Sequence, residues 1–135
     1  MVELNDGDRQ LIEAAREIIR KRRKPGIHSV GAALRTRSGR VFTAVHIEAY
    51  VARIAVCAEA IAIGMAAAEG EAEIDTIVAV RHTGRVASPC GMCRELIADY
   101  GPAARVIVPA PHGGETAVRI ADLLPNKYRR EDKEA

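Results

Sequence analysis

The sequence has very few aromatic residues, which limits what it can bind. Among 135 residues there is no tryptophan, one phenylalanine and three tyrosines. Proteins that bind single-stranded nucleic acids stack aromatic side chains on successive bases, so this composition disfavours a nucleic-acid polymer as partner. The charge balance agrees, because 20 Lys and Arg against 18 Asp and Glu leave a net charge of only +2.

The sequence also lacks a long apolar segment. Its best candidate, residues 54–68, contains Glu59 and is shorter than the roughly 20 residues that cross a bilayer. The first ten residues, MVELNDGDRQ, are polar and acidic, unlike the apolar core of a signal peptide. We therefore expect a cytoplasmic protein with no membrane partner.

Cysteine is scarce as well, with three residues in the chain. An odd number of cysteines in a reducing compartment disfavours a disulfide scaffold and favours a metal site or catalysis. Two of them stand three residues apart in 88-SPCGMC-93, and the third begins 57-CAE-59. Each falls at the predicted start of a helix, where free N–H groups and the helix dipole favour a thiolate.

What the sequence does contain is a core of small apolar residues. Apolar residues make up 48% of the chain, and alanine and valine carry most of that share, which excludes a disordered polypeptide. The length indicates one domain over residues 1–135. The charged tail, residues 127–135, is expected to fray.

Hydrophobic periodicity predicts the order α-β-β-α-β-α-β-α. Helices are expected from Asn5 or Asp6 to near Lys24, and over 57–70, 90–100 and 117–124. Strands are expected over 27–37, 41–47, 74–81 and 105–109, with the turn 38-SGR-40 joining the first two. Strands separated by helices favour parallel pairing, whereas a tight turn joins antiparallel strands. The predicted fold class is therefore α/β: a three-layer α/β/α arrangement, with a mixed sheet, an antiparallel first hairpin and helices on both faces.

The cysteine pattern allows several kinds of site. One helical turn lets Cys90 and Cys93 direct both sulfur atoms at one ion, with Cys57 as a third ligand. Three sulfurs without an evident fourth protein ligand favour a catalytic zinc, which keeps one position for water. Glu59 would then lie beside that position and move protons. A closed structural zinc with Glu59 or a histidine as fourth ligand, a redox CxxC pair, and buried cysteines without metal remain alternatives.

At these residues the chain resembles the zinc-dependent nucleoside deaminases. Their signature is C-A-E followed about thirty residues later by P-C-x-x-C, and it stands here as 57-CAE-59 and 89-PCGMC-93. The resemblance covers roughly residues 8–128, including 30-VGAAL-34, 39-GRVFTA-44 and 123-LLP-125. The three-cysteine form in a short domain is similar to the cytidine deaminase and blasticidin S deaminase branch.

The resemblance implies a cytidine deaminase-like fold, Zn²⁺ as cofactor and a hydrolytic reaction. Cys57, Cys90 and Cys93 match the zinc ligands, and Glu59 matches the proton shuttle. Zinc-activated hydroxide would attack the amine-bearing carbon of a cytosine-type ring, and ammonia would leave.

The implied substrate pocket uses further positions. Ala58 matches a residue whose backbone touches the base, and Ser88 one whose carbonyl receives the leaving amine. The family's Asn-x-Glu, which holds the ribose hydroxyl groups, stands here as 46-HIE-48, so Glu48 is kept and His46 replaces asparagine. His28 replaces an aromatic residue that precedes V-G-A-A, and its ring would stack on the base. Either histidine is equally well explained as a residue that packs within its strand.

Other features separate the chain from typical cytidine deaminases. The arginine often found after C-A-E, which neutralises the thiolates, is Ala60 here, so Arg94, Arg53 or the helix dipoles would have to compensate. The segment 116-TAVRIADLLPNKY-128 resembles the C-terminal region of blasticidin S deaminases, including Tyr128, which suits either a pocket wall or a subunit contact. Arg130 in the pocket would favour an anionic substrate.

Three functions of different classes follow. The first is a zinc-dependent aminohydrolase acting on a small molecule: a free cytosine nucleoside, blasticidin S or a related aminated heterocycle. The second is a deaminase relative that acts as a zinc-stabilised small-molecule binding protein. The third is polynucleotide editing, suggested by the basic run 20-RKRRK-24, which equally suits the solvated end of a helix. Small members of the resembled family are homotetramers, so we expect a homotetramer.

Overall fold

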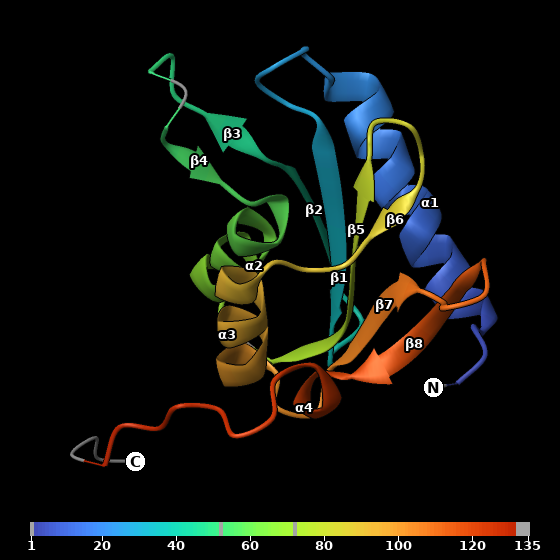
Figure 1. Ribbon diagram of the computed structural model, residues 1–135, viewed down its shortest axis with the longest axis vertical. Helices are drawn as coiled ribbons and strands as arrows, with labels where there is room; N and C mark the ends of the chain where they lie inside the picture. Colours follow the sequence, from blue (N-terminus) through green and yellow to red (C-terminus); the bar gives the residue numbers. More distant parts are fainter. Residues whose placement is uncertain (1, 52, 72, 132–135) are drawn as a thin grey trace.

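A six-stranded mixed sheet organises the computed structural model, which describes residues 2–51, 53–71 and 73–131 (Figure 1). The strand order is β2-β1-β5-β7-β8, and β6 also pairs with β5. β5 and β7 run parallel, and the other pairs in this sheet are antiparallel. The predicted mixed sheet with an antiparallel first hairpin is confirmed. The strands are β1 (Val30–Thr36), β2 (Val41–Val45), β5 (Ile74–Arg81), β6 (Val86–Ala87), β7 (Arg105–Pro109) and β8 (Glu115–Arg119).

Helices cover both faces of the sheet, as predicted (Figure 1). One face carries α1, and the other carries α2 and α3; the helices are α1 (Asp6–Arg22), α2 (Ala58–Ala68), α3 (Gly91–Tyr100) and α4 (Ile120–Leu123). α1 is amphipathic, because its buried residues recur at helical spacing while charged residues face solvent. Gly31 of β1 lets α1 pack closely, since a Cβ at this position would lie 2.6 Å from the carbonyl oxygen of Ala15.

Alternation along the strands sorts side chains between the two faces. On β5, Val78 packs in the cluster beneath α1, whereas its neighbour Ile77 packs in the cluster beneath α2 and α3. Where α2 begins, a third cluster is made of three alanines, Ala32, Ala58 and Ala79. Methyl side chains let the start of α2 lie close to the sheet, and this places the 57-CAE-59 segment against β1 and β5.

The prediction of a helix over 117–124 is wrong in its first part. β8 (Glu115–Arg119) occupies that part, and α4 is confined to Ile120–Leu123. The cause is the turn at Gly113 and Gly114, whose φ angles of 103° and 71° fold the chain back onto β7 as an antiparallel hairpin. Two adjacent glycines between apolar segments were the sequence signal for this hairpin.

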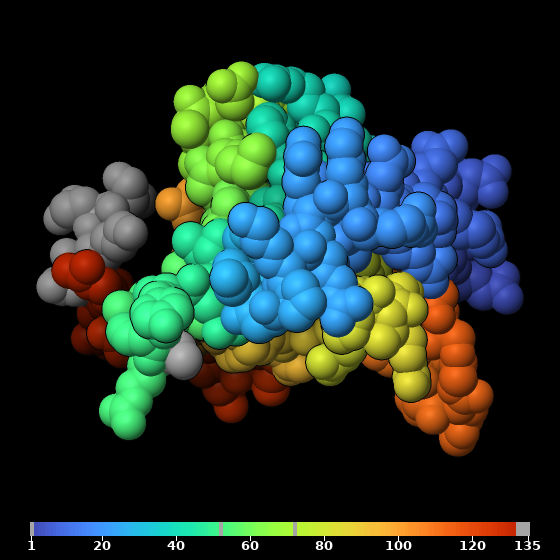
Figure 2. Space-filling view, turned by 90° about the horizontal axis from the view of Figure 1, so that it is seen from above, coloured from blue at the N-terminus to red at the C-terminus, as the bar shows by residue number. Residues whose placement is uncertain are grey.

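No strand was predicted between residue 47 and the second helix, yet most of a second small sheet lies there. β3 (Ile47–Glu48) and β4 (Ala55–Val56) pair in antiparallel register. Viewed from above, this hairpin, coloured green, stands out from the body of the molecule (Figure 2). The two-residue strand β6 was not predicted either, since strands this short carry no detectable alternation.

The segment after α4 has no regular secondary structure up to residue 131. Lys127 nonetheless ties it to α3, because its Nζ lies 3.1 Å from a carboxylate oxygen of Glu95 and 3.0 Å from one of Asp99. The last part of the tail that we expected to fray, residues 132–135, lies outside the described residues. In the described ranges, no helix combines the length and the apolar character needed to cross a membrane.

An ion pair between a buried carboxylate and a partly exposed guanidinium links α1 to β7. Asp8, which is 1% exposed, accepts hydrogen bonds of 2.6 and 2.8 Å from the guanidinium of Arg105 and forms a capping box with Asn5. Burial by itself raises the pKa of Asp8, but the N–H donors of Arg105 and the backbone N–H of Asn5 outweigh it. The pKa of this carboxyl group therefore lies below its usual range.

Asp8→Asn is expected to lower the free energy of unfolding by about 3 kcal/mol at pH 7, because it leaves Arg105 without its partner. Since the folded protein has the lower pKa, the contribution of the pair is complete above the unfolded pKa of about 3.9 and is lost as the pH falls through the folded pKa. Urea unfolding should show a lower free energy of unfolding for Asp8→Asn than for the unsubstituted protein at pH 7, and this difference should shrink under acid conditions. Asp6→Asn, exposed in the same turn, is the matched control. A difference independent of pH would contradict the role of this ion pair.

Candidate zinc active site

The three cysteines come together from the starts of two helices. Cys57 is the N-cap of α2 and Cys90 is the N-cap of α3, both with extended backbone, and Cys93 lies in the first turn of α3. Their Sγ atoms all lie within 4.8 Å of one another. The Sγ atoms of Cys57 and Cys90 are 3.4 Å apart. The structure thus brings to one point the residues that the CAE and CxxC motifs singled out.

This geometry suits a zinc ion. Thiolate sulfur is a soft ligand that selects zinc over magnesium or calcium. A Zn–S distance of about 2.3 Å in a tetrahedral site puts neighbouring sulfur atoms about 3.8 Å apart. This value falls between the 3.4 Å that separates Cys57 from Cys90 and the 4.8 Å within which all three sulfur atoms lie. Among the described residues, no histidine or carboxylate joins the cluster as a fourth group. A tetrahedral ion held here would keep one position for a small molecule.

Burial controls how readily the thiols ionise. It raises the pKa of Cys57, with the thiol of Cys90 adding to the rise, and it raises the pKa of Cys93, with the carboxylate of Glu59 adding to it. Burial also raises the pKa of Cys90, but the backbone N–H of Cys93 and the two neighbouring thiols outweigh it, so this pKa lies below its usual value. The expectation that a helix start lowers all three thiol pKa values therefore holds for Cys90 alone.

Glu59 lies in the first turn of α2, two residues after Cys57, and is only 6% exposed. Burial raises the pKa of its carboxyl group, and hydrogen bonds from its own backbone N–H and from the thiol of Cys93 oppose that rise only in part. A buried carboxyl group with a raised pKa beside a metal site is suited to hold and release a proton.

A cavity of about 220 Å³ opens beside the cluster. Its size, below the roughly 300–1,000 Å³ of pockets for larger ligands, suits a single heterocyclic ring. Cys57, Cys90 and Glu59 line it, together with three residues predicted to contact substrate: His46, Ala58 and Ser88.

The sheet contributes cavity residues that sequence reasoning missed. Val30 of β1, and Ala79 and Arg81 of β5, also line the cavity. They lie outside the CAE and CxxC motifs. The signal that could have found them is strand alternation, which places residues 79 and 81 on one face of β5.

The two predicted histidines lie side by side. Nδ1 of His46 accepts hydrogen bonds from the backbone N–H groups of Ser29 (2.8 Å) and Val30 (3.2 Å). The ring proton therefore sits on Nε2, which donates to Oε1 of Glu48 at 3.2 Å. His28 uses Nδ1 to donate to the carbonyl oxygen of His46 at 2.8 Å. His46 thus orients Glu48, while His28 fixes the backbone of His46. Neither His28 nor Glu48 lines the cavity, and their roles as substrate contacts stay predictions.

Tyr128 and Arg94 were also predicted to act at the site, and neither is seen in the predicted role. Tyr128 is 73% exposed and does not line the cavity, so its role as a substrate contact stays a prediction. The guanidinium of Arg94, one candidate to balance the thiolates, donates to the carbonyl oxygens of Pro89 (2.9 Å) and Leu123 (3.1 Å). Arg94 thereby joins the start of α3 to the end of α4.

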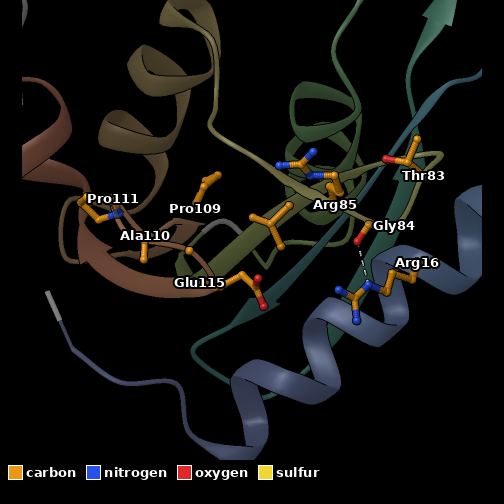
Figure 3. Close-up of a pocket in the computed structure, with 11 residues that line it drawn as sticks. Arg16, Thr83, Gly84, Arg85, Pro109, Ala110, Pro111 and Glu115 are labelled. Atoms are coloured by element: carbon orange, nitrogen blue, oxygen red, sulfur yellow. Dashed lines mark hydrogen bonds between the residues drawn. The ribbon is translucent and has the colours of Figure 1, made fainter.

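A larger cavity of about 680 Å³ lies between the turn that joins β5 to β6 and the β7–β8 hairpin (Figure 3). Arg16 of α1 lines it and donates from Nε to the carbonyl oxygen of Gly84 at 2.9 Å. None of the three cysteines lines this cavity, nor does Glu59. The smaller cavity is therefore the candidate active site on chemical grounds.

Known proteins share both the sequence and the fold. Residues 5–110 match the family model for the cytidine and deoxycytidylate deaminase zinc-binding region. A blasticidin-S deaminase of Bacillus cereus is 47% identical over 135 residues, covering 94% of this chain and 96% of the relative. A cytidine deaminase of Halalkalibacterium halodurans is 34% identical over 104 residues, covering 76% of this chain and 79% of the relative.

Solved structures of cytidine deaminases share the fold of this chain. The crystal structure of cytidine deaminase from Mycobacterium tuberculosis matches with a TM-score of 0.78 and 25% identity, over 94% of this chain and all of that one (100%). The cytidine deaminase of Burkholderia pseudomallei matches with a TM-score of 0.75 and 30% identity, over 93% of this chain and 100% of its own. The chain, with its converging cysteines, therefore belongs to the cytidine and deoxycytidylate deaminase family of zinc-binding enzymes.

Proposed function

We propose that this deaminase hydrolyses the ring amine of a free cytosine nucleoside or of a related heterocycle of the blasticidin S type. The observation that carries the proposal is the buried carboxyl group of Glu59, which shares a ring-sized cavity with Cys57 and Cys90. The names of the relatives, which give cytidine and blasticidin S, support this substrate class. A protein that only bound small molecules would have no use for a buried proton-transfer group at this position.

The proposed chemistry divides between the metal and Glu59. Cys57, Cys90 and Cys93 are the proposed zinc ligands, and zinc bound there activates water as a nucleophile near neutral pH. Glu59 would take one proton from that water and pass it to the ring nitrogen beside the amine-bearing carbon. It would then take the second proton, from the hydroxyl group now on that carbon, and give it to the amine, which leaves as ammonia while the C=O bond forms. The raised pKa of Glu59 matches it to this role of base and then acid.

Backbone groups at the two helix starts hold the ring. Ala58 is the first residue of α2, so its N–H has no partner within the helix and is free to donate to the base. Ser88 lies in the cavity wall before Cys90, where its carbonyl oxygen is proposed to accept the leaving amine. His28 and Tyr128, outside the cavity lining, are proposed as secondary contacts of the bound substrate.

The sugar is proposed to meet His46 and Glu48. His46→Ala is expected to raise KM about 10-fold with a smaller change in kcat, because it removes the hydrogen bond that aims Glu48 at the substrate. Steady-state kinetics with the preferred substrate checks this. Glu48→Gln is the matched variant, and the double variant should be no worse than the worse single one if the two residues act as a unit. Additive losses would contradict a shared role.

We also propose that the chain assembles as a homotetramer. Large apolar side chains are exposed on the β3–β4 hairpin and on the helices of one face, which is typical of surfaces covered by another chain. These residues are Ile47, Tyr50, Val51, Ile54, Met65, Met92 and Tyr100. Light scattering measures the assembly directly, and a monomer would contradict the proposal.

The substrate is identified by following the loss of ultraviolet absorbance and the release of ammonia. The panel holds cytidine, deoxycytidine, blasticidin S and several aminated heterocycles. Turnover of one compound, lost on chelation and restored by zinc, supports the proposal and names the substrate. No turnover of any cytosine compound by the zinc-loaded protein would contradict the proposed substrate class.

A further inference from the structure

Arg81 brings a fixed positive charge to the cavity beside the cysteines. It is the last residue of β5 and pairs with Val30, the first residue of β1. Alternation along β5 puts Arg81 on the same face as Ala79, and Ala79 packs against Ala58 at the start of α2. The side chain of Arg81 therefore leaves the sheet on the face that holds the cysteines and Glu59.

The described residues leave the guanidinium of Arg81 available to a ligand. Arg81 is exposed, and in the described ranges it forms no ion pair and no side-chain hydrogen bond. The carboxylates of the site are otherwise engaged, since Glu59 is buried beside Cys93 and Glu48 accepts a hydrogen bond from His46. A guanidinium stays charged at every relevant pH, and its planar set of N–H donors matches the two oxygens of a carboxylate or phosphate.

The backbone around Arg81 is held in place. The N–H of Arg81 donates to the carbonyl oxygen of Arg85, and the N–H of Gly84 donates back to the carbonyl oxygen of Arg81, both at 2.8 Å. The N–H of His82 donates to Ser29 at 2.8 Å, which ties the same turn to the segment before β1. The backbone that carries Arg81 is thus set before any ligand binds, so that binding has to order only its exposed side chain.

Arg81 is exposed whereas Glu59 is buried, so this charge lies toward the mouth of the cavity and away from the reacting groups. About 220 Å³ suits one heterocycle, so the substituent on the ring stays near the mouth. We propose that Arg81 is a specificity residue that binds an oxyanion, a carboxylate or a phosphate, on the sugar-side substituent of the substrate. The inference rests on the proposed deamination of a cytosine-type ring, and it adds that the preferred substrates are anionic.

The test compares substrates that differ only in this group. The values of kcat/KM are measured for cytidine, cytidine 5′-carboxylate and cytidine 5′-monophosphate. Arg81→Gln is expected to lower the ratio of kcat/KM for an anionic substrate to kcat/KM for cytidine by about 10- to 100-fold. Arg81→Lys should lower this ratio by less, because a lysine keeps the charge without the paired donors. Whichever anion shows the larger change in ratio identifies the group as carboxylate or phosphate. Arg85→Gln, in the same turn but outside this cavity, is the matched control and should leave the ratio unchanged.

Two kinetic outcomes would overturn the proposal. An unchanged ratio in Arg81→Gln means that Arg81 does not bind the anion. An equal loss with cytidine and with the anionic substrates means that Arg81 acts on the zinc centre, for example by balancing the thiolate charge.

A binding experiment tests the role of Arg81 independently of the proposed reaction. Calorimetry compares uridine with its 5′-carboxylate and 5′-monophosphate, which carry a cytosine-like ring without the amine. Tighter binding of an anionic form, lost in Arg81→Gln, supports the role of Arg81 even if no cytosine compound is deaminated. Equal affinity for the neutral and anionic forms in the unsubstituted protein rejects it.

Discussion

Replacing Glu59 by glutamine is expected to lower kcat by about 10²–10⁴-fold while the protein keeps its zinc. Glutamine has the shape of glutamate and fills the same buried space at the start of α2, so the fold and the three sulfurs are undisturbed. It cannot accept a proton from water or return one to the ring. The loss therefore falls on the chemical step, with a smaller change in KM.

The experiment pairs this variant with Glu17→Gln, which makes the same chemical change on the exposed face of α1. Kinetics, zinc content and thermal melting are measured for both variants. Glu17→Gln should match the unsubstituted protein in all three. A Glu59→Gln enzyme that turns over at the normal rate would show that another group moves the proton. One that has lost its zinc would show that Glu59 supports the metal instead.

The CAE and CxxC motifs could be recognised from the sequence because their cysteines stand where predicted helices begin. Cys57 and Cys90 stand at residues where apolar periodicity begins, so each could be placed at a helix start. Both helix starts lie beside Ala79 of β5, because Ala58 packs against it and Ala87, three residues before Cys90, pairs with it; this is why two motifs thirty-odd residues apart meet. The fold class follows from the same alternation of strands and helices.

Other features depended on contacts that no local pattern encodes. The adjacent glycines signalled a hairpin, but residues 117–124 read alone favoured a helix, and it is pairing with β7 that makes residues 115–119 a strand. The ring orientation of His46 is set by backbone N–H groups of residue 30, at the start of β1, and of residue 29, just before it. The raised pKa of Cys93 reflects burial in the core, which outweighs its place near a helix start.

Replacing Cys57 by alanine is expected to weaken zinc binding by at least about 10³-fold, since even changes outside the ligand set cost 10- to 100-fold in affinity. The variant should purify with little zinc and should not deaminate. Chelation should lower the melting temperature of the unsubstituted protein, because the ion binds the folded state and not the unfolded one, and it should leave the melting temperature of Cys57→Ala unchanged. Atomic absorption and thermal melting with and without a chelator measure both effects.

A second substitution at the same residue separates ligation from packing. Cys57→His restores a metal-binding atom while changing the shape of the side chain more than alanine does, and the wider deaminase pattern uses histidine at the first ligand position. If Cys57 is a ligand, histidine should recover zinc content where alanine does not. Met92→Ala, an exposed change beside Cys93, should keep zinc in full. If Cys57→Ala retained a full complement of zinc, Cys57 would not be a ligand and the ion would be held elsewhere. The open fourth position, which follows from three cysteine ligands, would then have to be explained by a different set of ligands.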